Sequence, residues 1–85
     1  MATKEEVTDA IINAVADTYE KDPSEITRET TFAELGVASL KCVSICVLGG
    51  ENLDLDDDIE FDVIAKSPTV GEAIDNTYAW LEKQE

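Results

Sequence analysis

Histidine is absent from this sequence, and basic residues are scarce, with six Lys and Arg against twenty Asp and Glu. Without histidine, neither a Ser–His–Asp triad nor a Cys–His pair can be assembled. The formal net charge of −14 repels nucleic acid phosphates and anionic lipid headgroups, so we expect neither nucleic acid nor a membrane as a partner. The same charge favours encounter with basic protein surfaces.

Cysteine is also scarce, which limits metal and redox chemistry. Cys42 and Cys46 stand four residues apart, a spacing that matches neither a CxxC redox motif nor half of a standard zinc site. We therefore expect two reduced core cysteines. The acidic run from Asn52 to Asp58 lacks the turn glycine and terminal glutamate of an EF-hand, and we expect a solvated acidic face with no metal site.

Long apolar runs are missing too. No stretch reaches the roughly 20 apolar residues that a membrane span needs, and the N-terminus does not have the pattern of a signal peptide. We expect a cytoplasmic protein. The 85 residues fit one domain with one core, too small to enclose a deep catalytic cleft as well. This favours a monomeric carrier or interaction domain over an enzyme.

Apolar residues make up 44% of the chain and recur at helical spacing, which argues against disorder. The first segment runs from about Lys4 to Glu20 and opens with a capping box formed by Thr3 and Glu6. Residues 21–38 form a long connection, which three apolar side chains anchor to the core: Ile26, Phe32 and Leu35. Gly36 is expected at a left-handed or closely approached position.

The second helix begins near Ser39 and ends at Leu48, or at Leu53 if it continues through Gly49 and Gly50. A short helix around 59–64 and a last helix from Thr69, with Glu72 completing a capping box, follow. The chain shows no strand-like alternation. We therefore predict an all-α fold, a four-helix bundle with a long loop between helices 1 and 2 and a short third helix.

Two apolar stripes run along the second helix. Cys42, Ile45 and Cys46 cluster on one face at 100° per residue, and we assign this face to the core. Leu40, Val43 and Val47 form a second stripe about a third of a turn away. If the first face is core, the second is exposed beside Ser39, as a contact surface would be.

The segment from Thr31 to Leu40 carries a recognisable motif: a Phe, two spacers, then Leu35-Gly36-Val37-Ala38-Ser39-Leu40. It resembles the attachment motif of acyl carrier proteins. The later segment Ser67-Pro68-Thr69-Val70 resembles the start of that family's last helix. Length, acidity, the long first loop and the four helices agree, so the resemblance covers nearly the whole chain and includes the family's acyl-carrier-like four-helix fold.

The resemblance implies that Ser39 carries a covalent 4′-phosphopantetheine arm, on which acyl groups are held as thioesters for fatty-acid, polyketide or related biosynthesis. A serine that opens a helix suits a phosphodiester, because the helix dipole and free N–H groups there favour negative charge. Taken alone, the same serine would be interpreted as an ordinary N-cap, and the rest of the chain favours modification. Implied partners are a phosphopantetheinyl transferase and acyl-transferring and synthase enzymes with basic or apolar docking patches.

Two further sets of residues follow from this interpretation. Partner enzymes would dock on an apolar stripe and an acidic segment, namely Leu40, Val43, Val47, Asp54, Asp56, Asp57 and Asp58. A short acyl chain could retreat between the helices, lined by Leu35, Ile45, Cys46, Val63 and Ile74.

The chain departs from the family pattern at Ala38, where the family has an Asp that helps the transferase to bind. Its second helix also lacks the family's outward acidic residues. These departures suggest a specialised carrier with dedicated partners. They also keep an alternative open: a non-catalytic helical interaction module of the same fold without the arm.

Overall fold

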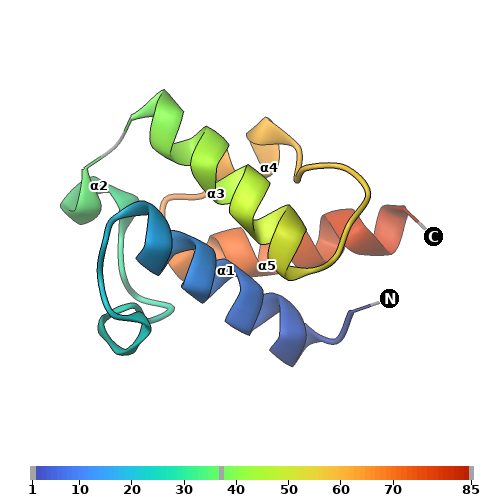
Figure 1. The fold of residues 1–85 in the computed structure, drawn as a ribbon, viewed down its shortest axis with the longest axis horizontal. Helices are drawn as coiled ribbons and strands as arrows, with labels where there is room; N and C mark the ends of the chain where they lie inside the picture. The colour runs from blue at the N-terminus through green and yellow to red at the C-terminus, as the bar shows by residue number, and fades with distance from the viewer. Residues whose placement is uncertain (1, 37, 85) are drawn as a thin grey trace.

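Helices form nearly all of the regular structure in the computed structural model, which describes residues 2–36 and 38–84 (Figure 1). In chain order the elements are α1 (Lys4–Thr18), the 3-10 segment η1 (Pro23–Glu25), α2 (Phe32–Leu35), α3 (Ser39–Asn52), α4 (Phe61–Ala65) and α5 (Val70–Lys83). The described residues form no strand; a single isolated bridge pairs Thr31 with Thr69. The predicted all-α class is confirmed.

Side-chain caps fix the start of α1 and of two short elements after it. The Thr3 hydroxyl accepts a hydrogen bond from the Glu6 N–H at 3.1 Å, and the Glu6 carboxylate accepts one from the Thr3 N–H at 2.8 Å. This is the predicted capping box, and the bond from the Thr3 backbone lowers the pKa of Glu6. The same reciprocal pattern opens η1, through Asp22 and Glu25, and α2, through Thr31 and Glu34.

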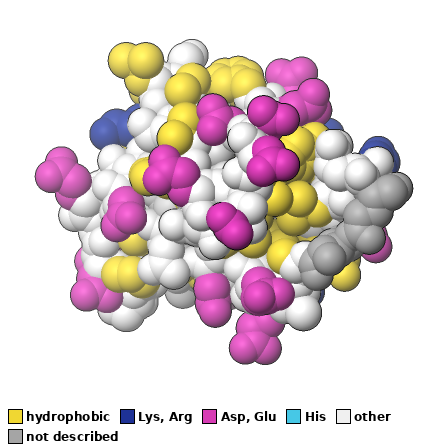
Figure 2. Space-filling view, turned by 45° about the vertical axis from the view of Figure 1, so that its right-hand side comes forward, with side chains coloured by type: hydrophobic (Ala, Val, Ile, Leu, Met, Phe, Trp, Pro, Cys, Tyr) yellow, Lys and Arg dark blue, Asp and Glu magenta, His cyan; other side chains and the backbone are white. Residues whose placement is uncertain are grey.

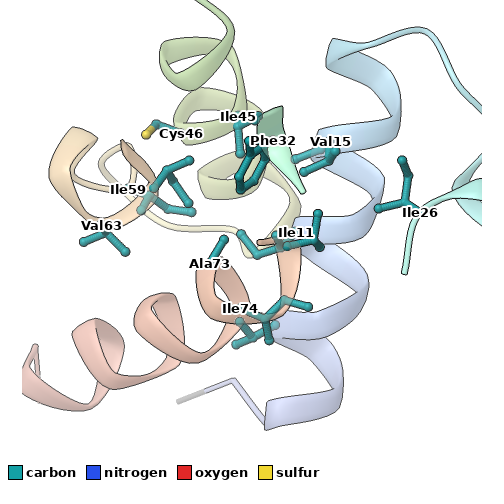
Figure 3. Packing of buried hydrophobic residues seen from close by; sticks show 14 of the residues in the cluster. Ile11, Val15, Ile26, Phe32, Ile45, Cys46, Ile59, Val63, Ala73 and Ile74 are labelled. Atoms are coloured by element: carbon teal, nitrogen blue, oxygen red, sulfur yellow. The ribbon is translucent and has the colours of Figure 1, made fainter. Parts of the chain in front are cut away.

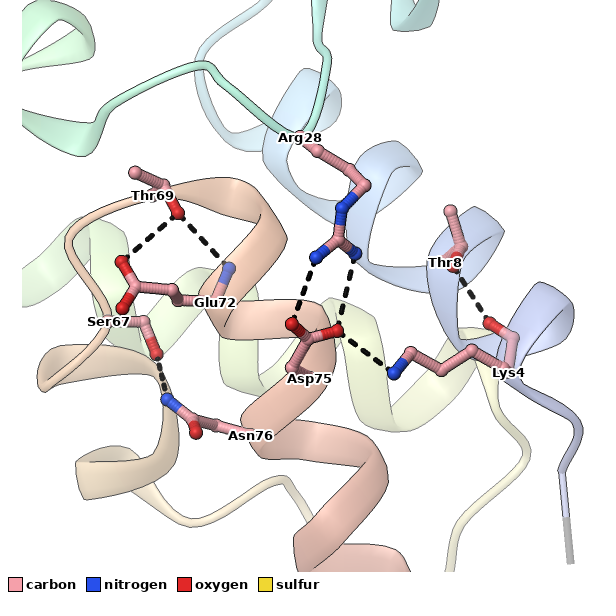
Figure 4. Close-up of polar contacts among 8 residues, drawn as sticks. All are labelled: Lys4, Thr8, Arg28, Ser67, Thr69, Glu72, Asp75 and Asn76. Carbon is pink, nitrogen blue, oxygen red and sulfur yellow. Dashed lines mark hydrogen bonds and ion pairs between the residues drawn. The ribbon is translucent and has the colours of Figure 1, made fainter.

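The start of α5 differs slightly from the prediction. Thr69 is the N-cap, so the helix begins at Val70, and its hydroxyl accepts a hydrogen bond from the Glu72 N–H at 3.1 Å. The Glu72 carboxylate accepts from that same hydroxyl, at 3.2 Å, instead of from the Thr69 backbone N–H (Figure 4). The reciprocal half of the predicted capping box is therefore absent.

Two helices end in the same way, and neither uses glycine. After α1, Lys21 N–H donates to the Ala16 carbonyl at 2.8 Å, and Glu20 takes a left-handed φ of 55°. After α3, Leu55 N–H donates to Gly50 at 2.9 Å, and Asp54 has a φ of 58°. Both are Schellman endings, which satisfy carbonyls of the last turn. The prediction that α1 reaches Glu20 was therefore wrong by two residues.

The connection between α1 and α3 is more ordered than predicted, since it contains η1 and the helical turn α2. Ile26 and Phe32 anchor it in the core, 4% and 7% exposed, and Leu35 packs half-buried against it. Arg28 in this connection binds the Asp75 carboxylate through two nitrogens, and Lys4 binds the same carboxylate at 2.9 Å (Figure 4). One acidic side chain thus links the connection, α1 and α5.

The core lies between α1, α3 and α5, with α4 closing one side (Figure 3). Ile11, Ile45 and Ile74 meet there, all fully buried. α3 runs straight through Gly49 and Gly50, which lie beneath the segment that leads to α4. A Cβ at Gly49 would lie 2.7 Å from Ile59 Cδ1, and one at Gly50 would lie 3.2 Å from the Asp57 carbonyl oxygen. The glycines therefore let this segment pass close to the helix.

Candidate functional site

Ser39 is the first residue of α3, and its side chain is exposed. The N-cap is Ala38, with φ −155° and ψ 141°, and no side chain caps this helix start. The alternative of Ser39 as an N-cap was therefore wrong. Its hydroxyl stands at the positive end of a 14-residue helix, where an attached phosphate would be electrostatically favoured.

The chain on both sides of Ser39 is tied to the end of α1. The Tyr19 hydroxyl donates to the Gly36 carbonyl at 2.9 Å, and Lys41 Nζ donates to the Thr18 carbonyl at 3.2 Å. Lys41 also lies 5.3 Å from the centre of the Tyr19 ring. Burial raises the pKa of Tyr19, so its hydroxyl is protonated and can donate. These contacts hold the Ser39 segment in a defined place.

Gly36 has a φ of +100°, as the prediction of a left-handed position required. A Cβ built there would meet no atom within 4 Å. The alternative reason for this glycine, close approach of another group, is thus wrong. Its backbone angle alone explains the glycine. Val37, the next residue of the motif, lies outside the described residues.

A pocket of about 390 Å³ opens beside the first turn of α3. Cys42, one helical turn after Ser39, forms part of its wall. The pocket is walled by α2, α3, α4 and the α4–α5 connection, through Phe32, Ala33, Cys42, Ile64, Ala65, Lys66, Ser67 and Pro68. It is apolar on most sides and is the natural place near Ser39 for a small apolar group.

The predicted acyl-lining residues do not surround this pocket. Ile45, Cys46, Val63 and Ile74 are at most 6% exposed and fill the core, and Leu35 is half-buried against it (Figure 3). The structure instead lines the pocket with neighbours of these residues, such as Cys42 and Ile64. Helical spacing identifies the inward face of a helix, but it does not distinguish residues that fill the hydrophobic core from residues that line a pocket at its edge.

The two cysteines are free and differ in exposure. Cys46 is 4% exposed, and burial raises the pKa of its thiol to about 11. It is therefore a protonated core residue at neutral pH, with its Sγ 3.8 Å from the Glu60 carbonyl oxygen. Cys42 is half-buried in the pocket wall.

The apolar stripe predicted for docking is largely exposed. Leu40 and Val43 are 81% and 45% exposed, and Val47 is half-buried. The predicted acidic docking residues Asp54, Asp56, Asp57 and Asp58 are all exposed. Figure 2 shows hydrophobic side chains gathered along the upper edge of the molecule, with acidic side chains beside them.

Phe61, at the start of α4, is 43% exposed and was missed by the sequence reasoning. Glu60, directly before it, accepts a contact from the Cys46 thiol through its carbonyl oxygen, so α4 begins beside the middle of α3. Helical spacing groups Phe61 with buried Ile64 and so offers no signal that it is exposed. Nothing in the sequence indicated that Ala33, Ala65, Lys66 and Pro68 would form part of a pocket wall either.

Among residues 2–36 and 38–84, no three His, Cys, Asp or Glu side chains gather into a metal-binding group. Within the same residues, no helix is long and apolar enough to cross a membrane.

No protein-family model matches this chain, and comparisons with curated proteins and with solved structures find no match either.

Proposed function

We propose that this chain is an acyl carrier domain, with Ser39 as the attachment point of a 4′-phosphopantetheine arm and with no catalytic activity of its own. The observation that carries the proposal is the placement of Ser39. It is exposed at the first position of a long helix without a side-chain cap, one turn from an apolar pocket. In the sequence, the Leu35-Gly36 pair of the acyl-carrier motif precedes Ser39, and Leu40 follows it directly.

The residues present fit the prosthetic group. A phosphodiester on Ser39 Oγ would meet the helix N-terminus, where Ala38 supplies no competing acceptor. The arm would supply a thiol that holds acyl groups as thioesters. The helical arrangement also supports the proposal: α1, α3, short α4 and α5 would be the four helices of an acyl-carrier bundle, with α2 inside the long first connection.

Partner enzymes would recognise the surface around Ser39 through two kinds of contact. Leu40 and Val43 offer apolar area that becomes buried on docking, at about 25 cal/mol per Å² before the cost of association. The acidic segment 54–58 would speed encounter with basic surfaces in a salt-dependent way. The phosphopantetheinyl transferase would approach the same surface.

Intact mass tests the proposal. The purified chain is incubated with coenzyme A and a broad-specificity transferase, beside Ser39→Ala and the matched control Ser44→Ala on the same helix. We expect one phosphopantetheine on the wild-type chain and on Ser44→Ala, and none on Ser39→Ala. Loading of Ser39→Ala would place the site elsewhere.

A second candidate function is an interaction module without the arm. Ala38 favours it, because the family's acidic residue at this position is missing. The exposed Leu40, Val43 and Phe61 favour it as well, since they provide a contact surface that needs no prosthetic group. Failure of both wild-type and Ala38→Asp chains to accept the arm would select this candidate.

A further inference from the structure

The pocket beside α3 differs in charge from the rest of the molecule. Twenty carboxylate side chains are spread over the chain, yet none of the residues that line this pocket is Asp or Glu. Three other pockets on the described residues each include at least two: Glu6, Asp9 and Asp54 in one, Glu60 and Asp62 in the second, and Asp56 and Asp57 in the third.

The one charged residue in the wall of this apolar pocket is a cation, Lys66. Lys66 also lines the neighbouring pocket that includes Glu60 and Asp62, so it stands between an apolar and an acidic pocket. Within residues 2–36 and 38–84, the ion pairs join Lys4 and Arg28 to Asp75, and Lys66 forms none. Lys66 caps the end of α4 and is exposed. A lysine ammonium at the margin of an apolar pocket can pair with an anion while its aliphatic stem covers apolar surface.

The pocket wall joins the first turn of α3 to the end of α4. Cys42, one turn after Ser39, lines it from α3, and Ala65 and Lys66 line it from the end of α4. A chain that enters beside Cys42 would find apolar side chains and the Lys66 ammonium in the same pocket wall. The volume of about 390 Å³ holds on the order of ten small groups at about 30 Å³ each, a water molecule's share of liquid volume.

From these observations we infer that the pocket accepts a short acyl chain that ends in a carboxylate, with Lys66 as the residue that pairs with that carboxylate. The inference rests on the proposed carrier function for the origin of the chain, and it names the class of acyl group. Overall charge opposes such a ligand, because a net charge of −14 repels any anion. A preference for the carboxylated chain therefore requires the local cation.

Free thioesters test the pocket without any need for loading. Hexanoyl-pantetheine and adipoyl-pantetheine have acyl chains of equal length and differ in the terminal carboxylate. Each is titrated into the protein while backbone amide resonances are followed. We expect both to shift the amides of Ala33, Cys42 and Ala65, with the adipoyl compound bound about threefold more tightly at low salt, as a partly exposed ion pair allows.

Lys66→Gln should reverse this preference, because the net charge then acts on the carboxylate without opposition. Lys83→Gln is the matched control: it removes the same charge from a residue that lines the neighbouring pocket with Lys66 but does not line this one, and it should leave the preference intact. Raising the salt concentration should weaken the preference of the wild-type protein. Absence of binding, equal binding of the two compounds, or an unchanged preference in Lys66→Gln would each overturn the inference.

The mass experiment separates this inference from the carrier proposal. If Ser39 is loaded but the protein shows no preference for the adipoyl compound, the inference about the pocket is wrong and the carrier proposal is supported. If Ser39 is not loaded but the preference depends on Lys66, the carrier proposal is wrong and the pocket is supported as a site for free carboxylated acyl compounds.

Discussion

The helix starts of this molecule fall into two groups. At α1, η1, α2 and α5, a threonine or aspartate N-cap accepts a hydrogen bond from the first turn. At α3 and α4 the N-caps are Ala38 and Glu60, and neither makes such a bond. The exposed large apolar side chains Leu40, Val43 and Phe61 all lie within the first five residues of these two helices.

This contrast separates residues that hold the fold from residues that remain available for binding. The capped starts satisfy backbone N–H groups within the chain. The Asp75 ion pairs link the same part of the fold, from α1 through Arg28 to α5. The start of α3 leaves helix-end polarity and apolar surface open one turn from the pocket-lining Cys42, and the start of α4 exposes Phe61. Natural proteins break local rules of this kind mainly where function requires it.

The largest expected effect contrasts the two faces of α3 directly. Ile45→Asp places a carboxylate in the core and should lower the free energy of unfolding by more than about 4 kcal/mol. This loss is enough to unfold a domain of this size. Val43→Asp, two residues earlier, should cost about 1 kcal/mol or less because that side chain is half in solvent. Circular dichroism and thermal melts measure both. Unfolding of Val43→Asp would show that the exposed stripe belongs to the core.

The next largest effect comes from substitutions that convert one kind of helix start into the other. Ala38→Asp should add a cap to α3 and stabilise the domain by about 1 kcal/mol, and Thr31→Ala should remove one from α2 at a similar cost. Denaturant unfolding measures both changes. Ala38→Asp should also raise the rate of loading by a generic transferase, and the gain should shrink in high salt. If Ala38→Asp leaves stability unchanged, the start of α3 is already satisfied in another way.

The smallest effect concerns Asp75. Hydrogen bonds from Arg28 and Lys4 lower its pKa below the ordinary 3.8, so the folded state binds the proton less readily than the unfolded state. The contribution of ionised Asp75 to the stability of the folded state is complete above pH 3.8 and is lost as pH falls through the lowered pKa. Asp75→Asn should cost about 1 kcal/mol or less near pH 6, since both ion pairs are exposed.

Asp9→Asn is the control, because it removes one exposed carboxylate that forms no ion pair within the described residues. The stability difference between wild type and Asp75→Asn should vanish in strong acid. A difference that persists below pH 2 would assign the effect of Asp75 to packing instead of charge.

Helix positions could be predicted from the sequence where apolar spacing and caps agreed. Thr3 with Glu6 located α1, and the Cys42, Ile45 and Cys46 spacing located the inner face of α3. The caps of η1 and α2 follow the same Thr/Asp-x-x-Glu pattern. The short helical elements within residues 22–35 could therefore have been predicted from the sequence, but they were missed. Helix ends were harder, because Glu20 and Asp54 occupy positions where glycine is the usual signal.

The candidate site could be predicted only in part. Ser39 and the exposure of Leu40 and Val43 follow from sequence position and helical spacing. The pocket wall does not, because it joins α2, the α3 start and residues 64–68, which only tertiary packing brings together. The exposure of Phe61 depends likewise on how α4 meets α3.

The most direct measurement of the carrier account is the amide spectrum of the protein before and after incubation with coenzyme A and a transferase. The account predicts new resonance positions for residues 38–43 and for the pocket residues 64–67, with the capped starts at Thr3 and Asp22 unchanged. An unchanged spectrum, or changes centred on the capped starts, would contradict it.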